Sequence, residues 1–141
     1  MGKAFKKATA EIDENAKYIS SLRDRFVKQV EEKIDDIKFN GPRHDRLPNN
    51  ASFSFRYIEG ESILFSLDLK GICASSGSAC SSGSLEPSRT LLAIGTPVGL
   101  AHGTIRFSFG KHNTVEEVDK TVEILAEEVK RLRAMSPLYK K

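Results

Sequence analysis

The chain has 141 residues, of which 39% are hydrophobic and 29% are charged, which is the usual composition of one globular domain with its own core. Its formal net charge is only +3, with 22 basic and 19 acidic residues mixed along the chain. The sequence therefore has no cluster of basic residues of the kind that binds nucleic acid or a membrane surface. Short apolar runs, a charged start and two cysteines predict a cytoplasmic protein with no membrane span, no signal region and no disulfide scaffold.

The first third of the chain has the apolar periodicity of one long helix. Apolar residues recur at steps of three or four positions from Phe5 to Ile34, and Gly41 and Pro42 follow beyond the predicted end. A helix of some thirty residues would be about 45 Å long, whereas a compact domain of this size is about 30 to 35 Å across. We therefore expect residues 1–17 to leave an apolar stripe partly uncovered, and to be frayed, bent or in contact with another chain.

The middle of the chain predicts two strands with a helix between them. Residues 52–57 alternate between aromatic and polar, which is typical of a half-buried strand. The aromatic residues of this strand are Phe53, Phe55 and Tyr57. Residues 61–70 predict a short helix for which Gly71 is a suitable C-terminal cap. Residues 72–74 predict a short buried strand, which makes Cys73 a packed core residue.

The second half predicts a further helix and strand. Pro87 suits the first position of a helix over residues 87–94, and Gly95 suits its end. Residues 104–109 alternate again, and predict a strand with an apolar and a polar side. The apolar side has Ile105, Phe107 and Phe109, and the polar side has Thr104, Arg106 and Ser108.

The last predicted element is an amphipathic helix that starts after Thr114. Thr114 and Glu117 have the spacing of a capping box, and apolar residues then recur at helical spacing until Ser136 and Pro137. Helices that alternate with short strands predict an α/β fold, in which a small β-sheet packs with helices and a long N-terminal helix precedes it.

The segment 75–84 places Cys80 among serines and glycines that cannot form a packed core. A reactive cysteine needs partial exposure and access to the thiolate form, whereas a structural one is usually buried among apolar neighbours. Gly77 and Gly83 on either side allow the backbone conformations that other residues resist. The segment therefore presents one thiol, although for Cys80 taken alone an incidental cysteine in a turn is the more common case.

Several runs of residues, in the same order, closely resemble the C-terminal part of the NifS/IscS-type cysteine desulfurases of the class V aminotransferase family. The runs are SSGSACSSGSLEPS at 75–88, AHGTIRFSFG at 101–110, NGP at 40–42, RLPNN at 46–50 and RLRAMSPL at 131–138. The resemblance covers nearly the whole chain and includes the opening helix, which is similar to the helix that joins the two domains of these enzymes.

The resemblance implies a specific chemistry. Enzymes of this family use pyridoxal phosphate to convert L-cysteine to L-alanine, and a loop cysteine holds the released sulfur as a persulfide. Cys80 stands at that position, within a loop that includes Ser78, Ala79 and Ser81. The sulfur then passes to an acceptor, such as a scaffold protein for iron–sulfur cluster assembly. The family pattern also implies that Arg106 binds the substrate carboxylate, and that the full-length enzyme is a homodimer. His102, next to the strand of Arg106, is a candidate to lie near the substrate.

No segment of this chain resembles the part of the family that carries the lysine of the pyridoxal phosphate site. The resemblance therefore implies a domain of a fold-type I pyridoxal phosphate enzyme: residues 1–38 as the linking helix, and residues 39–141 as the C-terminal small domain with the sulfur-carrier loop 75–84. We expect the chain alone to be inactive as a desulfurase. The alternative is a non-catalytic module that relays sulfur or binds the acceptor.

Other interpretations of the same residues follow from the sequence alone. Arg106 could form a cross-strand ion pair rather than bind a ligand. The spacing of the cysteines with His102 and His112 fits no common zinc pattern, so we expect no metal site. The serine and glycine segment lacks the Gly-Lys-Ser/Thr ending of a phosphate-binding loop.

Overall fold

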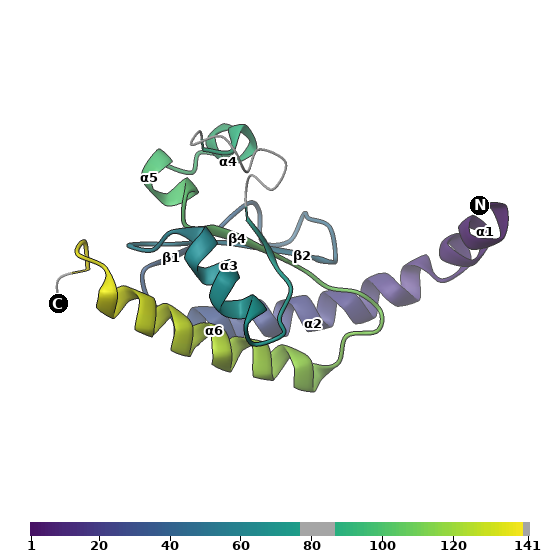
Figure 1. Cartoon of the computed structure of the whole chain (residues 1–141). Coiled ribbons are helices and arrows are strands. Elements are labelled where there is room, and N and C mark those ends of the chain that lie inside the picture. The colour runs from purple at the N-terminus through teal and green to yellow at the C-terminus, as the bar shows by residue number, and fades with distance from the viewer. Residues whose placement is uncertain (77–86, 140–141) are drawn as a thin grey trace.

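The computed structural model describes residues 1–76 and 87–139. Figure 1 labels its helices and strands. The helices are α1 (Gly2–Ala10), α2 (Ile12–Lys33), α3 (Gly60–Asp68), α4 (Arg89–Ala93), α5 (Val98–Ala101) and α6 (Val115–Met135). The strands are β1 (Ile37–Phe39), β2 (Asn50–Phe55), β3 (Ser75–Ser76) and β4 (Thr104–Ser108). No helix of these described residues is both long and apolar enough to cross a lipid bilayer.

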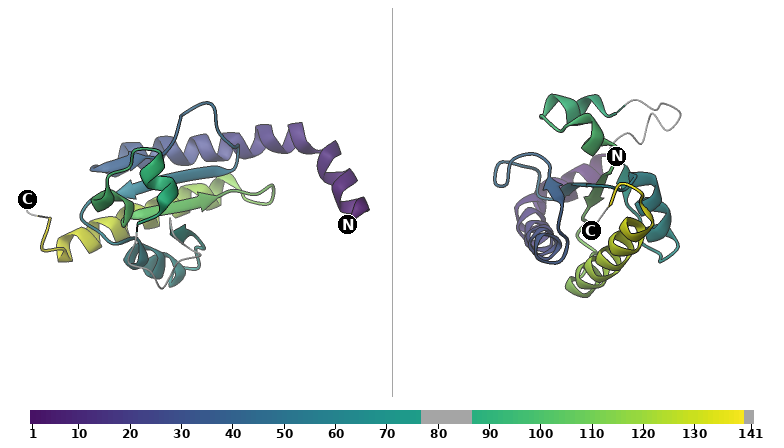
Figure 2. Two further views of the ribbon diagram at one scale, coloured as in Figure 1. Left: turned by 90° about the horizontal axis from the view of Figure 1, so that it is seen from above. Right: turned by 90° about the vertical axis from the view of Figure 1, so that its left-hand side faces the viewer.

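The four strands form one antiparallel sheet in the order β1-β2-β4-β3. The register pairs Phe53 with Ile105 and Ala51 with Phe107, so the apolar residues of both central strands lie on the same face. Helices α2, α3 and α6 cover this face, as Figures 1 and 2 show. The α/β prediction of a small sheet packed with helices is confirmed.

The core lies between the sheet and these three helices. It contains Phe53, Phe55 and Ile105 from the sheet, together with residues of the helices. The helical core residues are Leu22, Phe26, Val27, Val30, Ile63, Leu67, Val118, Val122, Leu125 and Val129. The Phe26 ring packs against Phe53 and Phe107, with centroids 6.3 and 4.7 Å apart, so α2 is fixed on the centre of the sheet.

The opposite face of the sheet is polar. The register pairs Ser52 with Arg106, and Ser54 with Thr104. Helices α4 and α5 lie over part of this face (Figures 1 and 2), where Ser54 and Thr104 are buried. Arg106 is exposed, so the polar face has a covered part and an open part.

The predicted N-terminal helix is present, but it consists of two helices. The break is at Glu11, whose φ of −101° and ψ of 4° are not helical. The Lys111 ammonium group binds the Glu11 carboxylate at 2.9 Å from the loop before α6. Phe5 and Ile12 are 74% and 61% exposed. The expectation of a bent segment with an uncovered apolar stripe is therefore confirmed.

Several predicted boundaries hold. Helix α6 begins with the predicted capping box: Thr114 Oγ1 accepts from the Glu117 backbone N–H, and the Glu117 carboxylate accepts from the Thr114 backbone N–H. Gly71 and Gly95 follow α3 and α4 in the left-handed conformation, with φ of 76° and 77°, which suits glycine at the end of a helix.

Other predictions need correction. Strand β2 ends at Phe55, and Tyr57 lies in a turn with φ of 68°. The helix predicted from Pro87 begins at Arg89 instead. Strand β1 and helix α5 were not predicted, because elements of three and four residues leave almost no periodic pattern.

The prediction of a buried strand over residues 72–74 is wrong, and so is the buried position of Cys73. The short strand comes later, at Ser75–Ser76, and Cys73 is exposed. Ile72 and Ala74, the residues before and after Cys73, pack against the core. Because successive side chains of an extended segment point in opposite directions, the residue between them points outward.

Candidate functional site

Arg106 lies at the centre of the open part of the polar face. Its Cα is paired with Ser52 of β2 on one side and with Ser75 of β3 on the other. Small hydroxyl side chains on both neighbouring strands leave the guanidinium group exposed. The alternation that buries Ile105 and Phe107 in the core is the reason that Arg106 points to the other face.

A second arginine, Arg46 in the loop after β1, contacts residues of both β1 and β2. Arg46 Nη2 donates to Asn50 Oδ1 at 3.3 Å, and its guanidinium lies 4.1 Å from the centroid of the Phe39 ring. Burial lowers the pKa of this guanidinium from its ordinary value, and the nearby Arg23 adds to the effect. Asn50 is two residues before Ser52 on β2, about 7 Å along the strand. The described neighbours of Arg106 on the adjacent strands are thus the small polar residues Ser52 and Ser75. Arg46 is the first residue of the RLPNN run at 46–50, and the sequence alone predicts no role for it.

Cys80, the predicted sulfur carrier, lies outside the described residues, together with Ser78, Ala79 and Ser81 of its loop. The two ends of their segment are described. On the N-terminal side, Ser75 and Ser76 pair with Arg106 and Ile105. On the C-terminal side, the half-buried Pro87 leads into α4. The chain therefore enters the segment 77–86 from the strand that adjoins Arg106.

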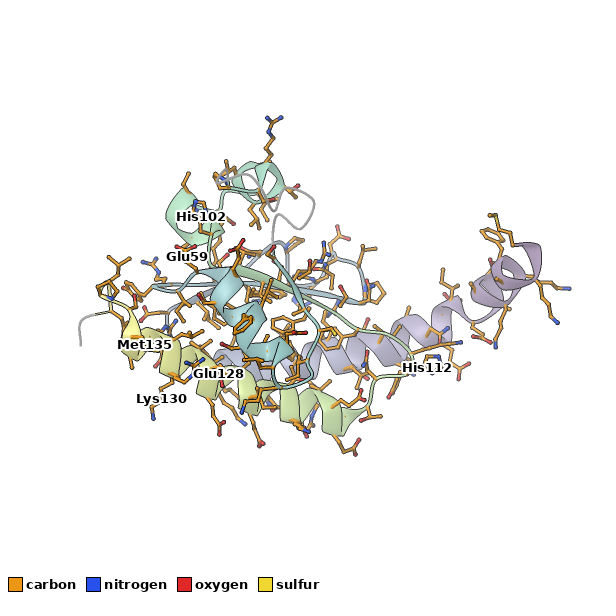
Figure 3. The ribbon with its side chains drawn as sticks, viewed as in Figure 1. Glu59, His102, His112, Glu128, Lys130 and Met135 are labelled. Atoms are coloured by element: carbon orange, nitrogen blue, oxygen red, sulfur yellow. The ribbon has the colours of Figure 1, made fainter. Side chains whose placement is uncertain are left out.

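His102 follows α5 and is exposed. Its backbone carbonyl accepts a hydrogen bond from the Gly60 N–H at 2.9 Å, which joins the start of α3 to the start of β4. Figure 3 shows His102 at the end of α5 near Glu59, whereas His112 lies beside the N-terminal start of α6. No group of three or more His, Cys, Asp or Glu side chains among residues 1–76 and 87–139 is arranged to hold a metal ion.

The lysines of the described residues do not fit a Schiff base with pyridoxal phosphate. Such a lysine needs a desolvated amine with a depressed pKa. Lys38 is half-buried, and every other lysine in the described part of the chain is exposed. Lys38 Nζ donates to the Gly95 carbonyl and to Thr96 Oγ1, both at 3.1 Å, so this amine already serves a structural contact. The site therefore offers an arginine that can bind a carboxylate, but no amine suited to the cofactor.

Comparison with solved structures finds this fold in NifS-like proteins and in an aminotransferase. A NifS-like protein matches with a TM-score of 0.79 and 30% identity over 92% of this chain and 32% of its own. A NifS-like protein from Rickettsia africae matches with a TM-score of 0.73 and 26% identity, over 86% of this chain and 31% of its own. An aminotransferase from Streptoalloteichus hindustanus shares the fold, with a TM-score of 0.64 and 11% identity.

The chain belongs to the aminotransferase class-V family, because the family model matches residues 1–121. Curated relatives extend this match over nearly the whole sequence. The cysteine desulfurase IscS of Dictyoglomus turgidum is 51% identical over 97% of this chain and 35% of its own length. The cysteine desulfurase IscS of Methanosarcina thermophila is 49% identical over 100% of this chain and 35% of its own length. The chain thus spans about a third of the length of the curated relatives that it matches.

Proposed function

We propose that this chain is the C-terminal part of a cysteine desulfurase, with residues 1–38 as the linking helical segment and residues 39–141 as the small domain. In the whole protein, L-cysteine would be converted to L-alanine, and Cys80 would hold the sulfur as a persulfide. The relatives named cysteine desulfurase support this proposal, since they are similar to this chain over almost all of its length. The carbon–sulfur cleavage chemistry belongs to pyridoxal phosphate, whose lysine we place outside these 141 residues.

The observation that carries the proposal is the position of Arg106 on the open polar face, one strand away from the segment that contains Cys80. A guanidinium group can bind a carboxylate through two parallel hydrogen bonds, which lysine cannot reproduce. Cys80 is four residues after Ser76, so its Cα can lie at most about 14 Å from that strand residue. The chain between Ser76 and Cys80 is therefore long enough for the thiolate to reach an amino acid whose carboxylate is bound at Arg106.

Cys80 would act as a nucleophile and then as a carrier. Its thiolate forms a bond to the sulfur atom of the substrate while the bond from that sulfur to carbon breaks. The electron pair of the broken bond stays with the carbon, which takes up a proton to become the methyl group of L-alanine, and the sulfur remains as a persulfide on Cys80. A thiolate of the acceptor protein then attacks the outer sulfur, and Cys80 leaves as the thiolate again. We propose a scaffold protein for iron–sulfur cluster assembly as the acceptor, a homodimer as the full-length enzyme, and the cytoplasm as its location.

A second candidate function is a non-catalytic module that receives sulfur from another enzyme or binds the acceptor. The lysines described above favour it for the isolated chain, since none of them fits the cofactor. The two functions share the carrier role of Cys80. They differ in whether these residues act together with a domain that binds pyridoxal phosphate.

Sulfur loading of Cys80 tests the carrier role. The chain is mixed with a functional cysteine desulfurase and L-cysteine, and the peptides of Cys80 and Cys73 are resolved by mass spectrometry. We expect a mass increase of one sulfur atom on the Cys80 peptide, its loss in Cys80→Ser, and its retention in the matched variant Cys73→Ser. Unmodified Cys80, or equal loading of the exposed Cys73, would contradict the proposal.

Activity of the chain alone distinguishes a complete enzyme from a part of one. With pyridoxal phosphate and L-cysteine added, we expect neither the absorbance of an aldimine with a protein lysine nor the formation of alanine. Alanine production at the level of an enzyme would refute the assignment to a domain that lacks the cofactor site.

A further inference from the structure

A chain of buried hydrogen bonds connects the sheet to helices α4 and α5 on the polar face. Thr96 Oγ1 donates to Asn40 Oδ1 at 3.0 Å, and Asn40 Nδ2 donates to Ser54 Oγ at 2.9 Å. Ser54 Oγ and Thr104 Oγ1 are 2.6 Å apart, and Thr104 Oγ1 donates to the Leu100 carbonyl at 3.3 Å. Asn40 and Thr96 are only 3% and 2% exposed.

One assignment of donors and acceptors satisfies every hydroxyl group in this chain. Thr104 has one hydroxyl hydrogen, which it gives to the Leu100 carbonyl, so Ser54 must donate to Thr104. Ser54 in turn accepts from the Asn40 amide, and Thr96, which donates to Asn40 Oδ1, accepts from Lys38 Nζ at 3.1 Å. Each hydroxyl group donates once and accepts once. A fully satisfied buried network of this kind is rigid, because any break leaves a buried polar group without a partner.

Both ends of the network lie in the segment that holds α4 and α5. Thr96 is between the two helices, and Leu100 is within α5. The two ends therefore hold this segment to the sheet over Ser54 and Thr104. Asn40 Nδ2 also donates to Ser52 Oγ at 3.3 Å, so the network reaches the register partner of Arg106, which is itself exposed. Figure 1 shows α4 and α5 together on the side of the sheet opposite α6.

We infer that Thr96 is a positioning residue for the site, which acts through Asn40 to hold the α4–α5 segment beside Arg106. The inference rests on the proposed role of Arg106 in binding the substrate carboxylate. Because the same segment begins just after Pro87, Thr96 also fixes the described end of the chain that follows residues 77–86.

The test uses Thr96→Val, which keeps the shape of the side chain without its hydroxyl, and Thr96→Ser, which keeps the hydroxyl. The first readout is amide hydrogen exchange of the 141-residue chain. In Thr96→Val, we expect exchange at Leu100, Ala101 and Gly103 to be about tenfold faster, because the buried Asn40 oxygen loses its donor and the segment opens locally. In Thr96→Ser, exchange should stay within about twofold of the parent chain. Amides of α6, such as those of Val122 and Leu125, should not change in either variant.

The second readout is the environment of Arg106 itself. Phenylglyoxal modifies arginine side chains, and the rate at each arginine is read from its peptide by mass spectrometry. We expect Arg106 to react about threefold faster in Thr96→Val and at the parent rate in Thr96→Ser, since only the first variant releases the neighbouring segment. Arg131 on α6, which binds Glu128 and Ser66, is the internal control and should not change.

Three outcomes would overturn the inference. They are parent-like exchange and Arg106 reactivity in Thr96→Val, equal effects of Thr96→Val and Thr96→Ser, and equal acceleration of exchange in α5 and α6. Neither readout requires sulfur transfer. Unloaded Cys80 in the parent chain would therefore refute the proposed function without deciding the role of Thr96, and the reverse also holds.

Discussion

Gly103 lies where the chain leaves α5 and enters β4, and its backbone is packed against the turn after β2. A Cβ atom at this position would be 2.2 Å from the Phe55 carbonyl oxygen and 2.7 Å from the Ile58 carbonyl oxygen. The Gly103 carbonyl also accepts from the Phe55 N–H at 2.9 Å. The close approach of two backbone segments explains why this residue has no side chain, and it holds the strand of Arg106 in place.

Gly103→Ala should therefore reduce the free energy of unfolding by about 2 kcal/mol or more, because backbone atoms must move to admit the methyl group. The matched control is Gly99→Ala in α5, where an added Cβ meets nothing within 4 Å. That variant should be neutral or more stable by up to about 1 kcal/mol. Urea unfolding measures both changes, and equal stability of the two variants would contradict the packing argument.

Cys73 shows what a residue's neighbours in sequence can and cannot predict. Its apolar setting, between Ile72 and Ala74, suggested burial, and those two neighbours do pack against the core. The exposure of Cys73 follows from the direction of one side chain in an extended segment. That direction depends on where the segment meets the sheet, and the local sequence does not show this.

Helices α2 and α6 are joined at their surface by a charged contact. Arg25 Nε and Nη2 donate to the two carboxylate oxygens of Asp119 at 2.7 and 2.8 Å, and Gln29 Nε2 donates to the same carboxylate at 2.6 Å. The hydrogen bond from Arg25, followed by that from Gln29, lowers the pKa of Asp119 from 3.8 to about 2. The contact links two helices that are far apart in sequence, on the outer side of the core.

The stabilisation from Asp119 should depend on pH. Because the pKa is lower in the folded state, the contribution is fully present above about pH 4 and is lost as the pH falls towards about 2. Asp119→Asn should therefore be less stable than the parent chain at pH 6, and the difference should shrink at pH 2.5. Urea unfolding at both pH values measures this, with Asp45→Asn in an exposed loop as the control. A difference that is independent of pH would exclude the carboxylate as its source.

The sequence predicted helices and strands correctly where the periodic pattern of apolar residues was long. Helix α6 was predicted with its capping box, because Thr114, Glu117 and a regular apolar stripe are all visible in the sequence. Strand β1 was not predicted. Its three residues are defined by their pairing with β2, as in Ile37 with Phe55 and Phe39 with Phe53, and a pairing partner some sixteen residues away leaves no local signal.

At the scale of the whole molecule, α1 is the part with least support from the rest of the chain. None of its residues is buried, and it continues beyond the compact part of the molecule at the N-terminal end of α2 (Figures 1 and 2). The nearest tertiary contact is the ion pair of Glu11 with Lys111, where both side chains are partly exposed. An exposed apolar stripe without a partner favours association.

Hydrogen exchange should reflect this difference in support. In a dilute solution of the chain, amides of residues 5–10 should exchange about a hundredfold faster than those of residues 22–30 in the buried part of α2. At high concentration we expect partial protection of α1 through self-association, and its loss in the double variant Phe5→Ser, Ile12→Ser. Core-like protection of α1 in a dilute monomer would show that the helix is stable without a partner.

The sequence by itself determined the α/β class, the two long amphipathic helices, the central strands and the resemblance to the cysteine desulfurases. These features depend on local periodicity or on contiguous motifs, so they can be read without coordinates. Only the tertiary structure decided the break at Glu11, the exposure of Cys73, the network from Lys38 through Thr96 to Thr104, and the open position of Arg106. Each of these results from contacts between residues distant in sequence, and the free energy of such contacts depends on packing that no local pattern contains.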